Sequence, residues 1–167
     1  YAVAQSLNTV AWQLYDQLTP EVGLQYLKNM NFTGIVKDDY TLATSLGGFT
    51  KGVSPLEMAA GFATIENDGM YREPTCIKTI IDSDENVVYA SQMTEVSIYE
   101  QDAARMMTDV LTTVMDSGTG RALKLKGMPC AGKTGTTNDH KDGWFVGFTR
   151  YYTTSVWVGC DYPKAIQ

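Results

Sequence analysis

Several residue types that mark common functional classes are scarce in this sequence. Its 167 residues include one histidine and three cysteines, and no two cysteines form a C-x-x-C pair. Protein zinc sites are usually built from such pairs, so we expect no metal site and no cofactor. Three cysteines cannot all pair with one another, and we interpret Cys76, Cys130 and Cys160 as small core or strand residues.

Long runs of one kind of side chain are also missing. The chain carries 13 Lys and Arg against 19 Asp and Glu, a net charge of −6, without a basic run that would indicate nucleic-acid binding. No apolar run is long enough to span a bilayer, and no signal peptide opens the chain. Because the chain lacks an initiator methionine and is apolar from its first residues, we expect it to be a piece of a longer protein.

The remaining composition is that of a globular domain, 44% hydrophobic and long enough to bury a core. Apolar spacing predicts mostly helix over Ala2–Leu18. Thr19-Pro20-Glu21, with Thr as N-cap, predicts a second helix that runs to about Met30. Ser54-Pro55-Leu56-Glu57 is a capping box, and Asn67-Asp68-Gly69 should end the helix that it begins.

The second half of the chain predicts one long helix and then strands. The helix covers Tyr99–Asp116, and its expected apolar face consists of Ala103, Met106, Met107, Val110, Leu111 and Val114. Cys76–Asp82 and Asn86–Ala90 indicate a hairpin before it. The strand of Lys133, Trp144–Arg150 and Thr153–Cys160 indicate an antiparallel meander after it. Helices packed on an antiparallel sheet give an α+β fold, in one domain or part of one.

The most informative stretch is Pro129–Gly147, PCAGKTGTTNDHKDGWFVG. On a strand, Lys133 and Gly135 share one face and Thr134 and Thr136 the other. A glycine there lets another backbone or a ligand approach closely. An ammonium, two hydroxyls and strand amides together suit an anionic ligand such as a carboxylate or a phosphate.

The same stretch contains a phosphate-loop pattern, since Gly127–Thr134 (GMPCAGKT) fits GxxxxGK[ST]. That loop needs a strand before it and a helix after it, whose N-terminus faces the phosphates. Gly135-Thr136-Thr137-Asn138-Asp139 is poor helix material. We therefore keep a nucleotide binder only as an alternative, which magnesium-dependent ATP binding lost on Lys133→Ala would favour.

Four segments together resemble a known family. Ser6-Leu7-Asn8 has the form S-x-N and Lys133-Thr134-Gly135 is K-T-G, two of the three motifs of penicillin-binding acyl-serine transferases. Their surroundings, AQSLNTVA, GVSPLEMAAGFATIENDG, SGTGRAL and AGKTGTTNDHKDGWFVGFTRYYTTSVWVG, resemble class A (bifunctional) penicillin-binding proteins in the family's order along essentially the whole chain. The third motif, S-x-x-K, is absent, because no serine here has a lysine three residues later.

The resemblance implies a fold and a reaction. Residues 1–167 would be a partial transpeptidase domain with an incomplete β-lactamase/transpeptidase-like fold, lacking the upstream nucleophile and the final helix. A serine would attack the D-Ala-D-Ala end of a peptidoglycan stem peptide, release D-Ala and pass the acyl group to an amine. Penicillins imitate that substrate and stop at the acyl-enzyme, and this chain alone would be inactive.

The resemblance also implies roles for residues of the two motifs. Ser6 would relay a proton to the leaving group, Asn8 would hold the substrate amide, and Lys133 would supply positive potential. The hydroxyls of Thr134 and Thr136 would bind the terminal carboxylate, Gly135 would let the ligand backbone pass, and the Thr136 amide would be one oxyanion donor.

Implied partners are stem peptides, β-lactam antibiotics and other cell-wall synthesis proteins, without nucleic acid. An upstream anchor would hold the protein at the outer face of the bacterial cytoplasmic membrane. Taken singly, Ser6 and Asn8 also fit a helix end, and Lys133 a solvated strand. His140, in a polar turn, fits a solvated loop better than a base. A non-catalytic binding or assembly module on the same fold is the second alternative.

Overall fold

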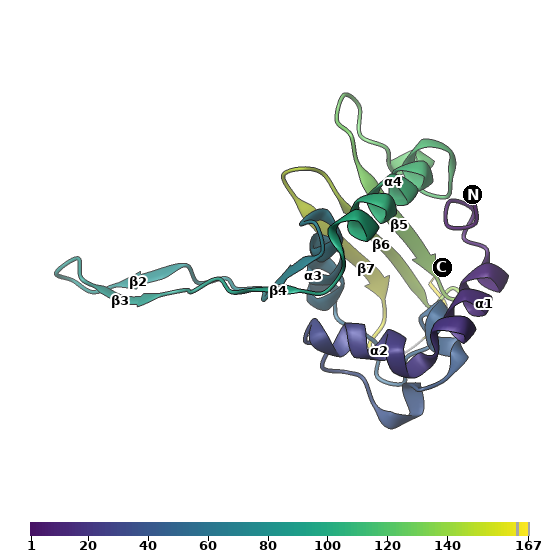
Figure 1. Ribbon diagram of the computed structural model, residues 1–167, viewed down its shortest axis with the longest axis horizontal. Helices are drawn as coiled ribbons and strands as arrows, with labels where there is room; N and C mark the ends of the chain where they lie inside the picture. Colours follow the sequence, from purple (N-terminus) through teal and green to yellow (C-terminus); the bar gives the residue numbers. More distant parts are fainter. Residues whose placement is uncertain (163, 167) are drawn as a thin grey trace.

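The computed structural model of the protein describes residues 1–162 and 164–166. In chain order its elements are α1 (Asn8–Leu18), α2 (Pro20–Asn29), η1 (Lys37–Asp39), η2 (Leu42–Leu46), α3 (Pro55–Glu66), β1 (Met70–Arg72), β2 (Thr79–Ile81), β3 (Val87–Ala90), β4 (Glu95–Ser97), α4 (Gln101–Ser117), η3 (Arg121–Leu123), β5 (Ala131–Thr136), β6 (Asp142–Phe148) and β7 (Thr153–Gly159). Helices α3 and α4 pack on the β5–β6–β7 sheet, which confirms the predicted α+β class (Figure 1).

The main sheet is the predicted antiparallel meander, in the order β5-β6-β7. Its register places Lys133 opposite Val146, and Ala131 opposite Phe148. Ala131 and Phe148 are buried against Leu111 and Val114 of α4, so this face of the sheet forms one core with the long helix. Strand β5 is therefore held by packing along one face as well as by its ladder with β6.

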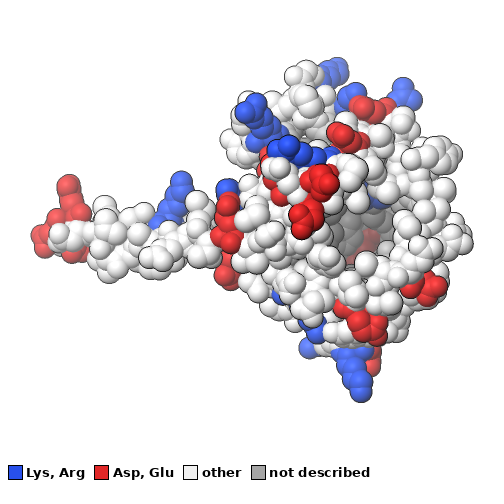
Figure 2. Space-filling view, viewed as in Figure 1, with Lys and Arg blue, Asp and Glu red and all other residues white. Residues whose placement is uncertain are grey.

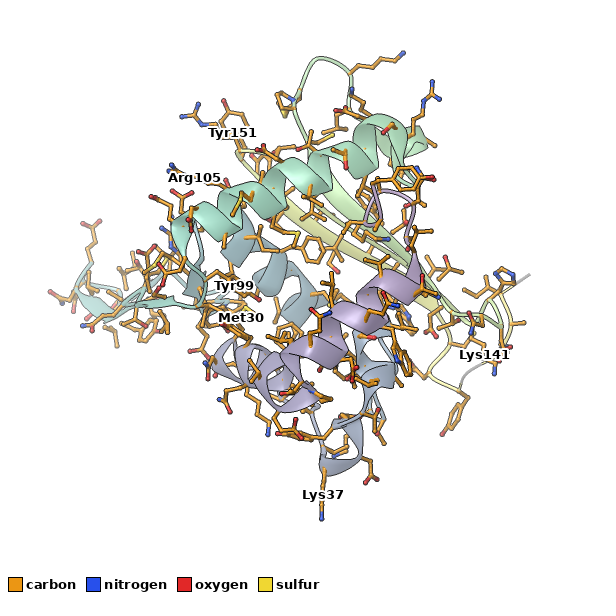
Figure 3. The ribbon with its side chains drawn as sticks, turned by 45° about the vertical axis from the view of Figure 1, so that its right-hand side comes forward. Met30, Lys37, Tyr99, Arg105, Lys141 and Tyr151 are labelled. Carbon is orange, nitrogen blue, oxygen red and sulfur yellow. The ribbon has the colours of Figure 1, made fainter. Side chains whose placement is uncertain are left out.

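A second core lies against α3 at Ala60. Met30, Phe32, Ala60 and Tyr71 are buried together, and Tyr99 packs against them just before α4 begins. Figure 3 shows Met30 and Tyr99 close to one another. The Tyr99 ring also stacks on Tyr26 of α2, with 5.5 Å between the ring centroids. This cluster attaches the α1–α2 pair to the rest of the fold.

Helix α3 begins and ends as its sequence predicts. The Ser54 hydroxyl accepts a hydrogen bond from the Glu57 amide (3.2 Å), and the Glu57 carboxylate accepts one from the Ser54 amide (2.7 Å). The same carboxylate also accepts the Thr33 amide at 2.7 Å. After Asn67 the chain turns at Gly69, whose φ of 87° is left-handed and favours glycine. The capping box is confirmed, and it additionally ties the preceding loop to the helix.

The prediction for the first two helices was partly wrong. Helix α1 begins at Asn8 rather than near Ala2, because Ser6 has a left-handed backbone (φ 54°) that no α-helix accommodates. Thr19 occupies the N-cap position of α2, but its side chain makes no capping bond. Thr19 instead ends α1, because it has a φ of 73° and its backbone N–H donates a hydrogen bond to the Tyr15 carbonyl. One residue therefore serves as the joint between two helices.

The predicted apolar face of α4 was also partly wrong. Leu111 and Val114 are buried as expected, but Met106 is 61% exposed and Met107 is 41% exposed. Ala104 and Met115 take their place in the core. The helix carries apolar side chains on two sides, and α3 and β5 cover only one of them, so periodicity alone could not identify the buried stripe.

The predicted hairpin is present as β2 and β3, which pair antiparallel at the end of an arm that projects from the body (Figure 1). Figure 2 shows acidic side chains at its tip, where Asp82, Ser83, Asp84 and Glu85 form the turn. The base of the arm is a second pair, β1 with β4, which the sequence did not predict. An Arg72–Glu95 ion pair lies across this base.

The loop between α2 and α3 is organised by one buried carboxylate. Asp39 is fully buried and accepts hydrogen bonds from the Val36 amide (2.8 Å) and from both the amide and the hydroxyl of Thr50 (2.7 Å each). Burial alone would raise the pKa of Asp39, but these hydrogen bonds hold it below its ordinary value. A segment that the sequence indicates only as irregular is therefore fixed at one point.

Candidate active site

Lys133 lies in the middle of strand β5 and reaches two polar atoms. Its Nζ donates to the Ser6 hydroxyl at 2.9 Å and to the Thr134 carbonyl at 2.8 Å. The side chain is half-buried, and this desolvation lowers the pKa of Lys133 below the ordinary lysine value. An ammonium that releases its proton more easily and is hydrogen-bonded to a hydroxyl can pass a proton to that hydroxyl.

Ser6 reaches this position through the turn that precedes α1. The left-handed backbone at Ser6 lets the chain reverse between Val3 and Leu7, with the Ser6 amide bonded to the Val3 carbonyl at 3.1 Å. Figure 1 shows this N-terminal turn beside the end of β5. A serine in a conformation that costs about 1–3 kcal/mol is held there by its surroundings, and such residues concentrate at functional sites. Asn8, the first residue of α1, is exposed next to it.

The chain just before Ser6 is fixed by the turn that follows α4. The Thr119 amide donates to the Ala4 carbonyl at 3.0 Å, and the Gln5 side chain donates to the Ser117 carbonyl at 3.4 Å. Gly118 approaches so closely that an added Cβ would lie 2.3 Å from the Ala4 carbonyl oxygen. The segment SGTGRAL contributes to the family resemblance, but nothing in the sequence alone indicates a role for Thr119 apart from its position after a long helix, between two glycines.

The rest of β5 offers backbone and hydroxyl groups to a ligand. Within the described residues β5 is an edge strand, so an extended peptide can add beside it. Thr134 is half-buried with its hydroxyl 2.6 Å from the Thr119 hydroxyl, and Thr136 is exposed at the end of the strand. Gly135 pairs with Trp144, and a Cβ added to it would lie 3.2 Å from the Trp144 Cβ. A larger residue at this position would therefore crowd the Trp144 side chain on the neighbouring strand.

The phosphate-loop alternative is wrong. Lys133 and Thr134 lie inside a strand that continues to Thr136, and the next element is the antiparallel strand β6. The helix whose N-terminus would bind the phosphates does not follow, because the chain turns back over Thr137–Lys141 into the sheet. His140 is exposed in this turn, where Lys141 and Asp139 form an ion pair at 2.8 Å.

Two further findings concern ions and membranes. In the part of the chain that the structure describes, no three His, Cys, Asp or Glu side chains gather closely enough to hold a metal ion. Among the same residues, no helix has the length and apolar character needed to cross a bilayer.

Comparison with known proteins identifies the family. The sequence-family model of the penicillin-binding protein transpeptidase domain matches residues 1–161 of this chain. The chain belongs to this family. Relatives include penicillin-binding protein 4 of Bacillus subtilis, 34% identical over 99% of this chain, and penicillin-binding protein 1A of Aquifex aeolicus, 36% identical over 99%. The chain covers 27% and 22% of the length of these two relatives.

Solved transpeptidase structures share the fold. Penicillin-binding protein 1A from Haemophilus influenzae superimposes with a TM-score of 0.83 over 96% of this chain and 29% of its own, at 22% identity. The PonA1 protein from Mycobacterium tuberculosis, solved in complex with penicillin V, also gives 0.83, over 98% of this chain and 48% of its own, at 23% identity. The predicted resemblance to class A penicillin-binding proteins and their fold is thus confirmed.

Proposed function

We propose that this chain supplies the proton-transfer and carboxylate-binding groups of a serine D,D-transpeptidase that cross-links peptidoglycan stem peptides ending in D-Ala-D-Ala. The observation that carries the proposal is the 2.9 Å hydrogen bond between Lys133 and Ser6. It joins an S-x-N and a K-T-G motif that are 127 residues apart in the sequence. Family membership supplies the reaction class, acyl transfer through a serine ester.

We assign the following roles to the site residues. After a serine attacks the penultimate D-Ala carbonyl, the departing D-Ala nitrogen must gain a proton. The Ser6 hydroxyl delivers it and is reprotonated by Lys133, whose lowered pKa eases the transfer. The Asn8 carboxamide holds the substrate amide. The Thr136 amide donates to the developing oxyanion, which is the charge that such sites stabilise most.

Substrate recognition follows from strand β5. The peptide lies antiparallel to the strand, with close passage at Gly135, and its terminal carboxylate accepts hydrogen bonds from Thr134 and Thr136. A penicillin presents a reactive amide and a carboxylate in a similar arrangement and is bound in the same way. Acyl transfer to a second stem peptide then forms the cross-link.

No serine in these 167 residues begins an S-x-x-K motif. We therefore further propose that the nucleophile belongs to a segment outside them. The chain spans 27% of the length of penicillin-binding protein 4, which leaves ample room for such a segment. The chain would then be part of a transpeptidase domain at the outer face of the bacterial cytoplasmic membrane, anchored by an upstream segment. By itself it would form no acyl-enzyme.

Intact-mass labelling with benzylpenicillin tests this function. The reagent is applied to this chain and to the protein extended upstream through the proposed nucleophile. One covalent adduct on the extended protein and none on this chain is the expected result. An adduct on this chain would make one of its own serines the nucleophile and overturn the role of Ser6. No adduct on either would favour a non-catalytic assembly module on the same fold.

A further inference from the structure

The turn that follows α4 touches both motifs of the proposed site. Thr119 donates its amide to the Ala4 carbonyl (3.0 Å), two residues before Ser6, and its hydroxyl lies 2.6 Å from the Thr134 hydroxyl. We propose that Thr119 is a positioning residue: it donates its hydroxyl proton to Thr134 and so directs the Thr134 proton to the carboxylate of the ligand. This inference rests on the proposed function and deepens it.

The proton count at these two hydroxyls supports the proposal. A hydroxyl has one proton and two lone pairs, and 2.6 Å is short for an O–H···O hydrogen bond, so one of the two threonines donates to the other. If Thr134 donated to Thr119, Thr134 would present only lone pairs to the ligand, which a carboxylate repels. If Thr119 donates, the Thr134 proton is free for the ligand. A bound carboxylate therefore selects the order Thr119, Thr134, carboxylate.

Such a chain also strengthens each of its members. A hydroxyl that accepts a hydrogen bond becomes a better donor, because the chain of dipoles is polarised in one direction. The last acceptor is an anion, and hydrogen bonds to ionised groups are about twice as strong as neutral ones. Thr119 would thus act on the carboxylate without touching it.

The position of the Thr119 hydroxyl is set by the backbone around it. The amides of Gly118 and Gly120 both donate to the Val114 carbonyl at 3.1 Å, which continues the turn directly from α4. Val114 is fully buried in the core that α4 shares with β5. On the other side of the hydroxyl pair, Lys133 Nζ donates to the Thr134 carbonyl at 2.8 Å. Both partners are therefore anchored before any ligand arrives.

The test uses the protein extended through its nucleophile and compares Thr119→Val, which keeps the shape, with Thr119→Ser, which keeps the hydroxyl. The probes are benzylpenicillin and its methyl ester, which lacks the negative charge. Acylation is followed by intact mass over a range of probe concentrations. We expect Thr119→Val to weaken initial benzylpenicillin binding roughly tenfold, the effect of losing about one hydrogen bond, with little change in the limiting acylation rate. The ester should be unaffected, and Thr119→Ser should restore binding.

A double-mutant cycle with Thr134→Val makes the test independent of the ester. Adding Thr119→Val to a protein that already carries Thr134→Val should not weaken benzylpenicillin binding further, because the Thr134 hydroxyl that Thr119 positions is already absent. Two results would overturn the proposal and leave Thr119 with a structural role. One is that the two substitutions weaken binding independently, so that their fold-losses multiply in the double variant. The other is that Thr119→Val weakens the binding of benzylpenicillin and of its methyl ester equally. Absence of any wild-type adduct would instead overturn the proposed function, and this inference with it.

Discussion

Gly118 provides a direct test of how the site is held together. The residue lies between α4 and the chain that leads to Ser6, with a φ of −103° that any residue can adopt. The glycine is therefore required for space and not for backbone freedom. A Cβ at this position would lie 2.3 Å from the Ala4 carbonyl oxygen and 2.9 Å from the Val114 Cα. The Ala4 carbonyl makes the shorter of these two contacts, so we expect the segment that contains Ala4 to move in Gly118→Ala.

The size of the displacement follows from these distances. An ordinary contact between a methyl group and an oxygen is about 3.4 Å, so the Ala4 carbonyl has to retreat by roughly 1 Å. Ser6 follows two residues later, and its 2.9 Å bond to Lys133 would stretch beyond hydrogen-bonding distance. A misplacement of about 1 Å at a reacting group can slow catalysis about 10²-fold. Overpacking should also lower the free energy of unfolding by about 1–3 kcal/mol.

The assay is the rate of acylation by benzylpenicillin in the protein extended through its nucleophile, with unfolding by urea measured on the same variants. Gly61→Ala is the matched control. Gly61 lies within α3, and a Cβ added to it would make an ordinary 3.4 Å contact with the Phe32 ring. It should acylate like the wild type. If Gly118→Ala reacts within threefold of the wild type while losing the expected stability, the turn does not set the distance between Ser6 and Lys133.

Three further predictions concern stability and use denaturant unfolding of the chain. Asp39→Asn should cost about 3 kcal/mol at pH 7, because the amide nitrogen that replaces one buried carboxylate oxygen faces a hydrogen-bond donor and cannot accept from it. This difference should shrink as the pH falls below the ordinary value of 3.8 and through the lowered pKa of Asp39. Burial lowers the pKa of Lys133 in the folded protein, so the unfolded chain holds that proton more tightly. The stability of the wild type relative to Lys133→Met should therefore rise with pH until about 10.5. A stability difference that does not change with pH would contradict the lowered pKa. Met115→Ala should cost about 3 kcal/mol, whereas Met106→Ala should cost less than about 0.5 kcal/mol, since Met115 is 1% exposed and Met106 is 61% exposed.

Local chemistry predicted those elements whose ends are determined locally. The capping box at Ser54 and the left-handed turn at Gly69 bound α3 as expected, since their hydrogen bonds lie within a few residues. The hairpin and the meander were also predictable, because alternation and turn residues determine them. The start of α1 was not, because the left-handed Ser6 lies next to contacts from Thr119 and Lys133 more than a hundred residues away.

The sequence indicated which residues are candidates for the site, but it did not indicate how they are arranged. Nothing in the spacing of Ser6 and Lys133 indicates that they meet, and only resemblance to a family suggested that they share a site. The pair β1 and β4 escaped notice for a related reason. Its strands are three residues long and separated by the whole arm, so neither shows a recognisable alternation.

The contacts around Thr119 indicate what holds the two motifs of the candidate site at a fixed distance. S-x-N and K-T-G are short polar motifs, and neither can hold the other in place through one 2.9 Å hydrogen bond at an exposed serine. The turn after α4 bonds to both, and this turn continues a helix whose buried face packs on β5 itself. The distance between the motifs is therefore determined by the packing of α4 on the sheet. Substitutions in that core should lower the rate of acylation by benzylpenicillin in the extended protein even where the protein remains folded, because a shift of α4 moves the chain before Ser6 relative to β5.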